Sequence, residues 1–220
     1  MNESSCPLPG VSFVVPVYNK ALHLPRVLTQ IKAQRGSFQR QYVFVDDGST
    51  DNSLEILRKE TAGWNDSIIE SQENQGSAGA TNTGITLSNQ PYIKFVDADD
   101  LLHEDATLHL LEALKDSEAC LIFGSVYRFA KNDDLDLSSS LGDGEVVTIK
   151  APLLQALKNS LFNPTQFLAR TAAIKQVGGC DERVVHSQEY GLTLRLARQW
   201  SFLKSTATVA YIPKDAPGRL

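Results

Sequence analysis

The chain has 220 residues, 42% of them hydrophobic and 21% charged, which suffices to bury the core of one globular domain. Its 21 basic and 26 acidic residues give a formal net charge of −5, without a basic stripe. Nucleic-acid binding therefore has no electrostatic support, and we expect none. An anionic phosphate substrate would need a cation between it and this acidic protein.

The spacing of the cysteines and the lack of long apolar runs indicate the cellular compartment in which we expect the protein. Cys6, Cys120 and Cys180 lie far apart and fit neither a zinc site nor a disulfide framework, which favours a reducing compartment. The first residues lack the basic and apolar regions of a signal peptide, and no apolar run approaches the ~18 residues of a spanning helix. We expect a cytoplasmic protein, with peripheral association at the cytoplasmic membrane face left open.

Strand and helix patterns alternate through the first 130 residues. Short β-branched and aromatic runs predict strands, and apolar residues at helical spacing predict the helices between them. The predicted strands cover residues 11–18, 42–46, 67–70, 91–96 and 120–123, and the predicted helices cover 21–34, 51–60, 74–87 and 108–114. This alternation predicts an α/β fold with a Rossmann-like, mostly parallel central sheet and helices on both faces.

The pattern changes after residue 129. Residues 131–144 are polar and rich in Ser and Asp, which predicts a loop. The sequence leaves open whether this loop closes over a ligand as a lid or is a plain surface loop. A short helix over 152–158, a strand over 166–170 and a helix over 188–200 are predicted to follow.

Polar residues follow the ends of three predicted strands, at residues 16–18, 46–47 and 97–100. Ligands of open α/β sheets bind beyond the carboxyl ends of the strands. If the strand before Asp97 stays extended, Asp97 and Asp99 point the same way and repel each other. A divalent cation relieves that repulsion, and Mg²⁺ binds through one or two carboxylates plus substrate phosphates. The alternative is a polar strand exit that caps the next helix.

Six stretches of the chain together resemble a family 2 glycosyltransferase with the GT-A fold. They are VVPVYN at 14–19, VDDGSTD at 45–51, NQGSAGATNTGI at 74–85, FVDADD at 95–100, GGCDE at 178–182 and QEYGL at 188–192. They occur in the family's order and spacing. The resemblance implies a single GT-A domain over 1–220, with a nucleotide-sugar-binding half at about 10–130 and an acceptor-side half at about 131–220.

The resemblance also implies how the donor is bound. Pro16 and Tyr18 are expected to line the nucleotide base and ribose. Asp47 is expected to accept a hydrogen bond from the base, with uracil favoured, while Asp46 holds the turn. Asp97 is expected to face the ribose and the sugar phosphate.

Two further donor-side roles follow from the resemblance. Asp99 is expected to ligate Mn²⁺ or Mg²⁺ on the diphosphate. Asn82 is expected either to hydrogen-bond near the donor or only to brace its loop.

The resemblance places the general base at Glu189. The family usually carries Glu-Asp here, whereas this chain has Gln188-Glu189, so the carboxylate is one methylene longer and its reach changes by about 1 Å. The alternative role is a Glu in the first turn of a helix, where the macrodipole favours it. Thr81 replaces a common Arg, and residues 210–220 lack a His often found there. The sequence leaves open whether the acceptor side is truncated at its C-terminus.

The implied reaction is inverting, metal-assisted transfer of a sugar from a nucleotide-sugar, with a UDP-sugar favoured, to a hydroxyl of a saccharide or lipid-linked acceptor. A catalytically silent relative that binds nucleotide or a partner enzyme is one alternative. A sugar-nucleotide pyrophosphorylase is another, although it would carry a Gly-rich, Arg-containing loop where this chain has residues 16–20. The sequence leaves the donor sugar, the acceptor and the oligomeric state open.

Overall fold

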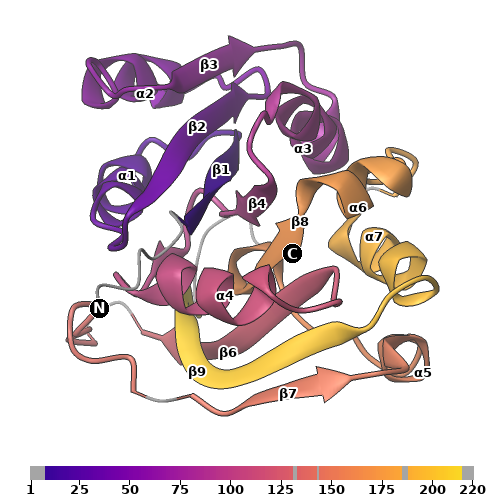
Figure 1. The fold of residues 1–220 in the computed structure, drawn as a ribbon. Helices are drawn as coiled ribbons and strands as arrows, with labels where there is room; N and C mark the ends of the chain where they lie inside the picture. Colours follow the sequence, from indigo (N-terminus) through magenta and orange to yellow (C-terminus); the bar gives the residue numbers. More distant parts are fainter. Residues whose placement is uncertain (1–7, 131–132, 143, 185–187, 215–220) are drawn as a thin grey trace.

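A computed structural model describes residues 8–130, 133–142, 144–184 and 188–214. Within them, one nine-stranded sheet has the order β3-β2-β1-β4-β8-β6-β9-β5, and β7 pairs with β9 (Figure 1). The strands are β1 (Leu8–Val17), β2 (Phe38–Asp46), β3 (Ser67–Ser71), β4 (Tyr92–Phe95), β5 (Leu101–Leu102), β6 (Leu121–Phe129), β7 (Val146–Ile149), β8 (Phe167–Arg170) and β9 (Phe202–Pro213). The helices are α1 (Leu24–Lys32), α2 (Ser53–Glu60), α3 (Gly76–Leu87), α4 (Ala106–Lys115), α5 (Pro152–Ala156), α6 (Thr171–Gln176) and α7 (Gln188–Ala197), with a 3-10 helix at Pro164–Gln166.

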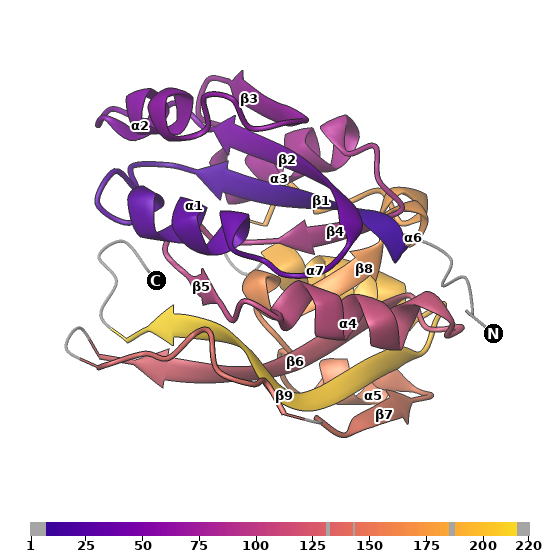
Figure 2. The same ribbon diagram turned by 60° about the vertical axis from the view of Figure 1, so that its left-hand side comes forward.

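The first four strands in spatial order are parallel, as the alternation of strands and helices predicts. β1 pairs with β2 on one side and β4 on the other, and β2 pairs with β3. These strands run side by side in Figure 2. Their carboxyl ends therefore meet at one edge of the sheet.

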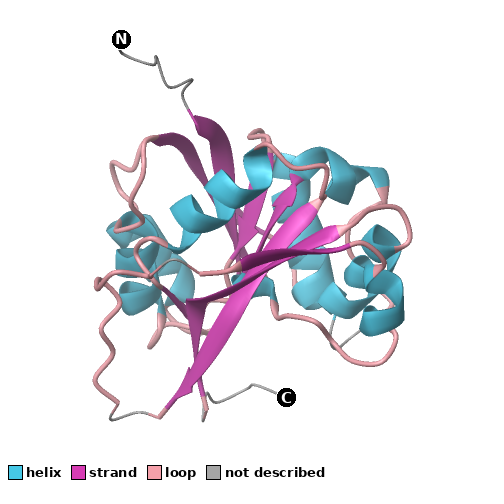
Figure 3. Ribbon diagram, turned by 60° about the horizontal axis from the view of Figure 1, so that its bottom comes forward, coloured by secondary structure: helices cyan, strands magenta, loops and turns pink. Residues whose placement is uncertain are grey.

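Side chains on β1 alternate between two separate cores. Phe13 and Val15 pack with the apolar faces of α1 and α4, whereas Val14 packs with α3. Consecutive side chains of a strand point to opposite faces, so the apolar run of β1 has to be covered on both sides. Figure 3 shows helices on both sides of the strands. The predicted α/β class with helices on both faces is confirmed.

The second half of the sheet mixes directions. β8 lies antiparallel between β4 and β6, and β9 runs parallel to β6. β9, β7 and α6 were not predicted, and β6 extends six residues beyond the run predicted at its start. Gly124 allows the close approach of β6 and β9, since a Cβ there would lie 2.6 Å from the Val209 side chain. Among the described residues, no helix combines the length and apolar character that crossing a bilayer requires.

Candidate active site

Two loops at the carboxyl ends of β1 and β2 are tied into one unit by Asn19. Its side-chain Oδ1 accepts hydrogen bonds from the backbone N–H groups of Thr50 (2.8 Å) and Asp51 (3.3 Å). Asn19 itself adopts φ +52°, a left-handed conformation that Asn tolerates better than most residues. Asp51 closes the unit from the other side, accepting from the Ala21 N–H at 3.1 Å and from the Ser53 N–H at 2.9 Å.

The residues predicted to line the base lie at the rim of this unit. Pro16 is partly exposed near the end of β1, and the Tyr18 side chain is 48% exposed. An exposed aromatic ring on a braced loop can stack on a planar base at little cost in conformational entropy. The position of Tyr18 is therefore compatible with its predicted role, which stays a prediction.

Asp47 is almost completely buried, and its carboxylate holds the loop that follows β3. Its Oδ1 accepts from Gln72 Nε2 at 2.8 Å and from the Gln75 backbone N–H at 2.9 Å. Among the described residues, no donor contacts the second carboxylate oxygen of Asp47, which is the atom left for a base N–H. For Asp46, Ser71 Oγ lies 3.5 Å from Oδ2, and the buried Oδ1 has no described hydrogen-bond partner. The structure thus leaves both aspartates as candidates for the ligand.

The strand before Asp97 does not stay extended to Asp99, so the alternation argument for these two carboxylates does not apply. β4 ends at Phe95, and the chain then turns at 98–99, where the Asp100 N–H donates to the Asp97 carbonyl at 3.0 Å. The Asp97 N–H donates to Thr165 Oγ1 at 3.0 Å, which anchors the turn against the segment before β8. The orientation of the carboxylates is therefore set by a turn and its tertiary contacts.

A fully buried lysine lies behind the acidic turn. Lys94 Nζ donates to the carbonyl of Phe95 at 3.2 Å and to that of Thr165. Burial lowers the Lys94 pKa to about 7, and the nearby charges of Asp100 and Asp97 partly oppose this effect. This residue, which the sequence analysis did not single out, places a donor beneath the turn.

Asp99 is paired with a lysine from the β1–α1 loop. Lys20 Nζ lies 2.8 Å from Asp99 Oδ2, and the side chains are 19% and 6% exposed respectively. Among the described residues, no three His, Cys, Asp or Glu side chains form a metal-binding group. One or two carboxylates completed by substrate phosphates are an established way to hold Mg²⁺, so Asp99 suits such an ion by its chemistry when a diphosphate supplies further oxygens.

Asn82 joins the two halves of the chain. Its Nδ2 donates to the Cys180 carbonyl at 3.0 Å and to Glu182 Oε1 at 2.7 Å, and its Oδ1 accepts from the Cys180 N–H at 2.8 Å. Gly179 has φ +67°, and a Cβ there would lie 2.5 Å from Asn82 Oδ1, so glycine is required at this contact. The bracing role expected for Asn82 is present in the structure, whereas a donor contact stays a prediction.

Glu189 lies in the first turn of α7, as predicted. Its side chain is partly buried, and burial raises the pKa of the carboxyl above its usual value. Burial raises the pKa of the Cys180 thiol to about 12, and the negative charge of Glu189 adds to this rise. Glu189 therefore lies near the 178–182 loop. The side chain of Gln188 lies outside the described residues.

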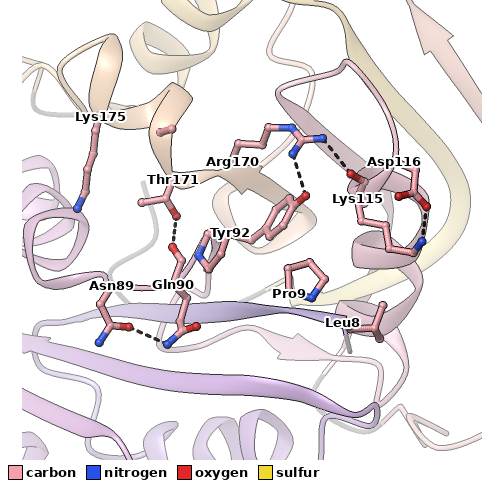
Figure 4. Close-up of a pocket in the computed structure, with 12 residues that line it drawn as sticks. Leu8, Pro9, Asn89, Gln90, Tyr92, Lys115, Asp116, Arg170, Thr171 and Lys175 are labelled. Carbon is pink, nitrogen blue, oxygen red and sulfur yellow. Dashed lines mark hydrogen bonds and ion pairs between the residues drawn. The ribbon is translucent and has the colours of Figure 1, made fainter. Parts of the chain in front are cut away.

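A cavity of about 800 Å³ opens at the opposite edge of the sheet, where β1 and β4 begin (Figure 4). Arg170 contributes to its wall, but all three guanidinium nitrogens donate to protein acceptors, which include Tyr92 Oη at 2.9 Å. Lys175 Nζ donates to the Ser88 carbonyl at 3.0 Å. Because these cations hold the fold together, we place the candidate active site at the carboxyl edge instead.

The profile of glycosyl transferase family 2 matches residues 12–178. The matched residues include the motifs at the carboxyl ends of β1, β2 and β4 and the motif at the start of α3. This match covers more than half of the chain. The chain belongs to glycosyltransferase family 2. Glu189 lies beyond the matched residues, so the family match does not itself place the base.

Similar proteins agree with this family. The chain is 34% identical over 125 residues to the glycosyltransferase GlyG of Streptococcus pneumoniae, which covers 56% of this chain and 41% of GlyG. It is 29% identical over 108 residues to a poly-beta-1,6-N-acetyl-D-glucosamine synthase of Staphylococcus aureus, which covers 49% of this chain and 26% of the synthase. The matched region is thus less than half the length of these curated relatives.

Solved structures support the predicted fold. The crystal structure of Staphylococcus aureus TarS in complex with UDP-GlcNAc matches with a TM-score of 0.74 and 18% identity, covering 94% of this chain and 59% of that chain. The crystal structure of TarS residues 1–349 matches with a TM-score of 0.72 and 19% identity, covering 93% of this chain and 60% of that chain. This family 2 chain therefore has the GT-A fold that its motifs predict.

Proposed function

We propose that this chain binds a nucleotide-sugar, with a UDP-sugar as donor, and transfers the sugar to a hydroxyl of a saccharide or lipid-linked acceptor. One observation carries the proposal. The loops that contain Tyr18, Asp47 and Asp99 follow adjacent parallel strands and so lie at the same edge of the sheet, in a chain of family 2. The UDP-GlcNAc bound to TarS and the synthase named for an N-acetylglucosamine polymer favour a UDP-sugar.

Donor binding uses the braced strand ends. Tyr18 and Pro16 flank the base, and the second carboxylate oxygen of Asp47 accepts the base N–H. Asp97 faces the ribose and the sugar phosphate. Because Gln72 and Gln75 already hold Asp47 in place, the acceptor atom is positioned before the ligand arrives.

Asp99 would hold Mn²⁺ or Mg²⁺ together with the diphosphate. When bound, such a cation neutralises charge on the leaving phosphate. Asn82 keeps the 178–182 loop against α3 and so fixes the path toward α7.

Glu189 acts as the general base. Its carboxylate takes the proton of the acceptor hydroxyl while that oxygen attacks the anomeric carbon. The bond between the anomeric carbon and the phosphate oxygen breaks on the opposite face, and the nucleoside diphosphate leaves with the electron pair. Burial raises the pKa of Glu189, which makes its carboxylate a stronger base than that of an ordinary glutamate.

A thermal-shift experiment with UDP, in Mn²⁺ and in EDTA, tests the binding step. A ligand at a hundredfold excess over its Kd stabilises the folded state by about 2.7 kcal/mol, so the shift should be easily measured with Mn²⁺. Release of UDP from UDP-GlcNAc and other UDP-sugars in the presence of saccharide acceptors then tests transfer. The absence of any UDP-dependent shift would contradict the proposal, while binding without turnover would favour a silent nucleotide-binding relative.

A further inference from the structure

The ion pair between Lys20 and Asp99 joins residues 79 positions apart at the centre of the candidate donor site. Asp99 is 7% exposed as a residue, so its carboxylate has little contact with water. A carboxylate that is largely removed from water needs a partner of opposite charge. In this structure the ammonium group of Lys20 supplies that charge.

The backbone of Lys20 is firmly placed. Its N–H donates to Ser53 Oγ at 2.8 Å, and its carbonyl accepts from the N–H groups of His23 (2.9 Å) and Leu24 (3.0 Å), at the start of α1. The side chain beyond this anchor is a flexible four-carbon stem ending in three N–H donors. Lys20 can therefore swing its charge over several ångströms without disturbing the loop.

Asp99 Oδ2 cannot serve an ammonium and a divalent cation at the same position, because the two positive charges repel at such short range. A diphosphate beside Asp99 offers several anionic oxygens, and lysine binds phosphate as a point charge. The ammonium that leaves Asp99 thus has a new partner within its reach as soon as the donor is bound.

We propose that Lys20 is the resident counter-ion of Asp99, that a divalent cation displaces it, and that the displaced ammonium binds the diphosphate of the donor. The second part rests on the proposed function, because it requires a nucleoside diphosphate at this edge. The first part concerns only the protein and the ion. Lys20 is therefore a diphosphate-binding residue as well as a brace for Asp99.

Mn²⁺ binding without nucleotide, followed by electron paramagnetic resonance of the free ion, tests the first part. Lys20→Met removes the competing charge and should tighten Mn²⁺ binding roughly tenfold, which corresponds to about 1.4 kcal/mol. Lys20→Arg keeps the charge and should leave the affinity near that of the parent. Lys59→Met is the matched control, since the Lys59 side chain is 79% exposed on α2. Unchanged Mn²⁺ affinity in Lys20→Met would overturn the displacement.

Calorimetry with UDP at saturating Mn²⁺ tests the second part. With the cation on Asp99, the displaced ammonium binds the diphosphate, so Lys20→Met should weaken UDP binding at least tenfold. Lys20→Arg should restore most of it, and Lys59→Met should have no effect. A UDP affinity at saturating Mn²⁺ that Lys20→Met leaves unchanged would overturn the diphosphate contact.

Two outcomes, unfolding of Lys20→Met and failure of the parent to bind UDP, need a further measurement. If Lys20→Met unfolds because Asp99 is left without its counter-ion, the double variant Lys20→Met with Asp99→Asn removes the stranded charge. Its UDP affinity in EDTA should fall below that of Asp99→Asn alone, in which the Lys20 ammonium no longer pairs with Asp99. If the parent binds no UDP in Mn²⁺, the proposed function fails and the diphosphate contact fails with it. The Mn²⁺ measurement on Lys20→Met then decides the displacement separately.

Discussion

Glu189→Gln separates a general base from a helix-terminal charge. As a base, Glu189 removes the acceptor proton, and positioned proton transfer is worth roughly 10²–10⁴-fold in rate. We expect a loss of that size in sugar transfer, with UDP-sugar affinity unchanged. Glu189→Asp should also be slow, because its carboxylate retreats by about 1 Å from the position given by the longer side chain.

The thermal stability of Glu189→Gln also separates the two roles, because they predict changes of opposite sign. Burial raises the folded-state pKa of Glu189, so the ionised form is disfavoured in the fold. The stability associated with this group is present below its unfolded pKa and is lost as pH rises through the folded pKa. Glu189→Gln should therefore hold or slightly raise the melting temperature at pH 7. A helix-terminal role alone predicts a loss of about 0.3–1 kcal/mol.

The assay is the initial rate of UDP release with acceptor, measured from pH 5 to pH 8, beside thermal unfolding. The rate of the parent should fall on acidification through a pKa above the usual glutamate value, and Glu189→Gln should lose this dependence. Glu55→Gln is the matched control, because Glu55 lies in the first turn of α2. Transfer by Glu189→Gln at the parental rate would refute the assignment.

Three further predictions concern the donor side. Asp47→Ala should weaken UDP binding by roughly 1.5–3 kcal/mol through loss of a charge-assisted hydrogen bond, whereas Asp46→Ala should mainly lower the stability of the fold. If calorimetry shows that Asp46→Ala loses UDP binding and Asp47→Ala keeps it, the roles of the two aspartates are reversed. Asp99→Asn should abolish the additional stabilisation that Mn²⁺ gives to the UDP complex, and a thermal-shift difference between Mn²⁺ and EDTA that survives the change would remove Asp99 from the metal site. Asn82→Ala breaks three hydrogen bonds to the 178–182 loop and should lower the unfolding free energy by about 1–3 kcal/mol in urea denaturation, with unchanged stability as the contrary result.

The sequence by itself determined the parallel half of the sheet and the chemistry at its edge. Apolar runs that end in Pro16-Val17-Tyr18, Asp46-Asp47 and Asp97 are buried strands followed by polar loops, and parallel strands bring such loops together. These signals are local, since an apolar run and the polar residues that follow it are read from neighbouring positions in the sequence. β9 escaped prediction because its polar positions include the exposed Lys204 and Thr206, and its pairing partner β6 lies some 80 residues earlier.

Tertiary structure decided how the site residues are held. The alternation argument failed at Asp97 because Thr165 and the turn before Asp100 end the strand, and Thr165 is 68 residues away. Asn82 meets Cys180 across 98 residues. Lys20 meets Asp99 only because the ends of β1 and β4 are adjacent in the sheet. A residue pattern specifies which side chains reach an edge, but a hydrogen-bond or ion-pair partner is fixed only when distant segments pack, because donor and acceptor must then satisfy each other away from water.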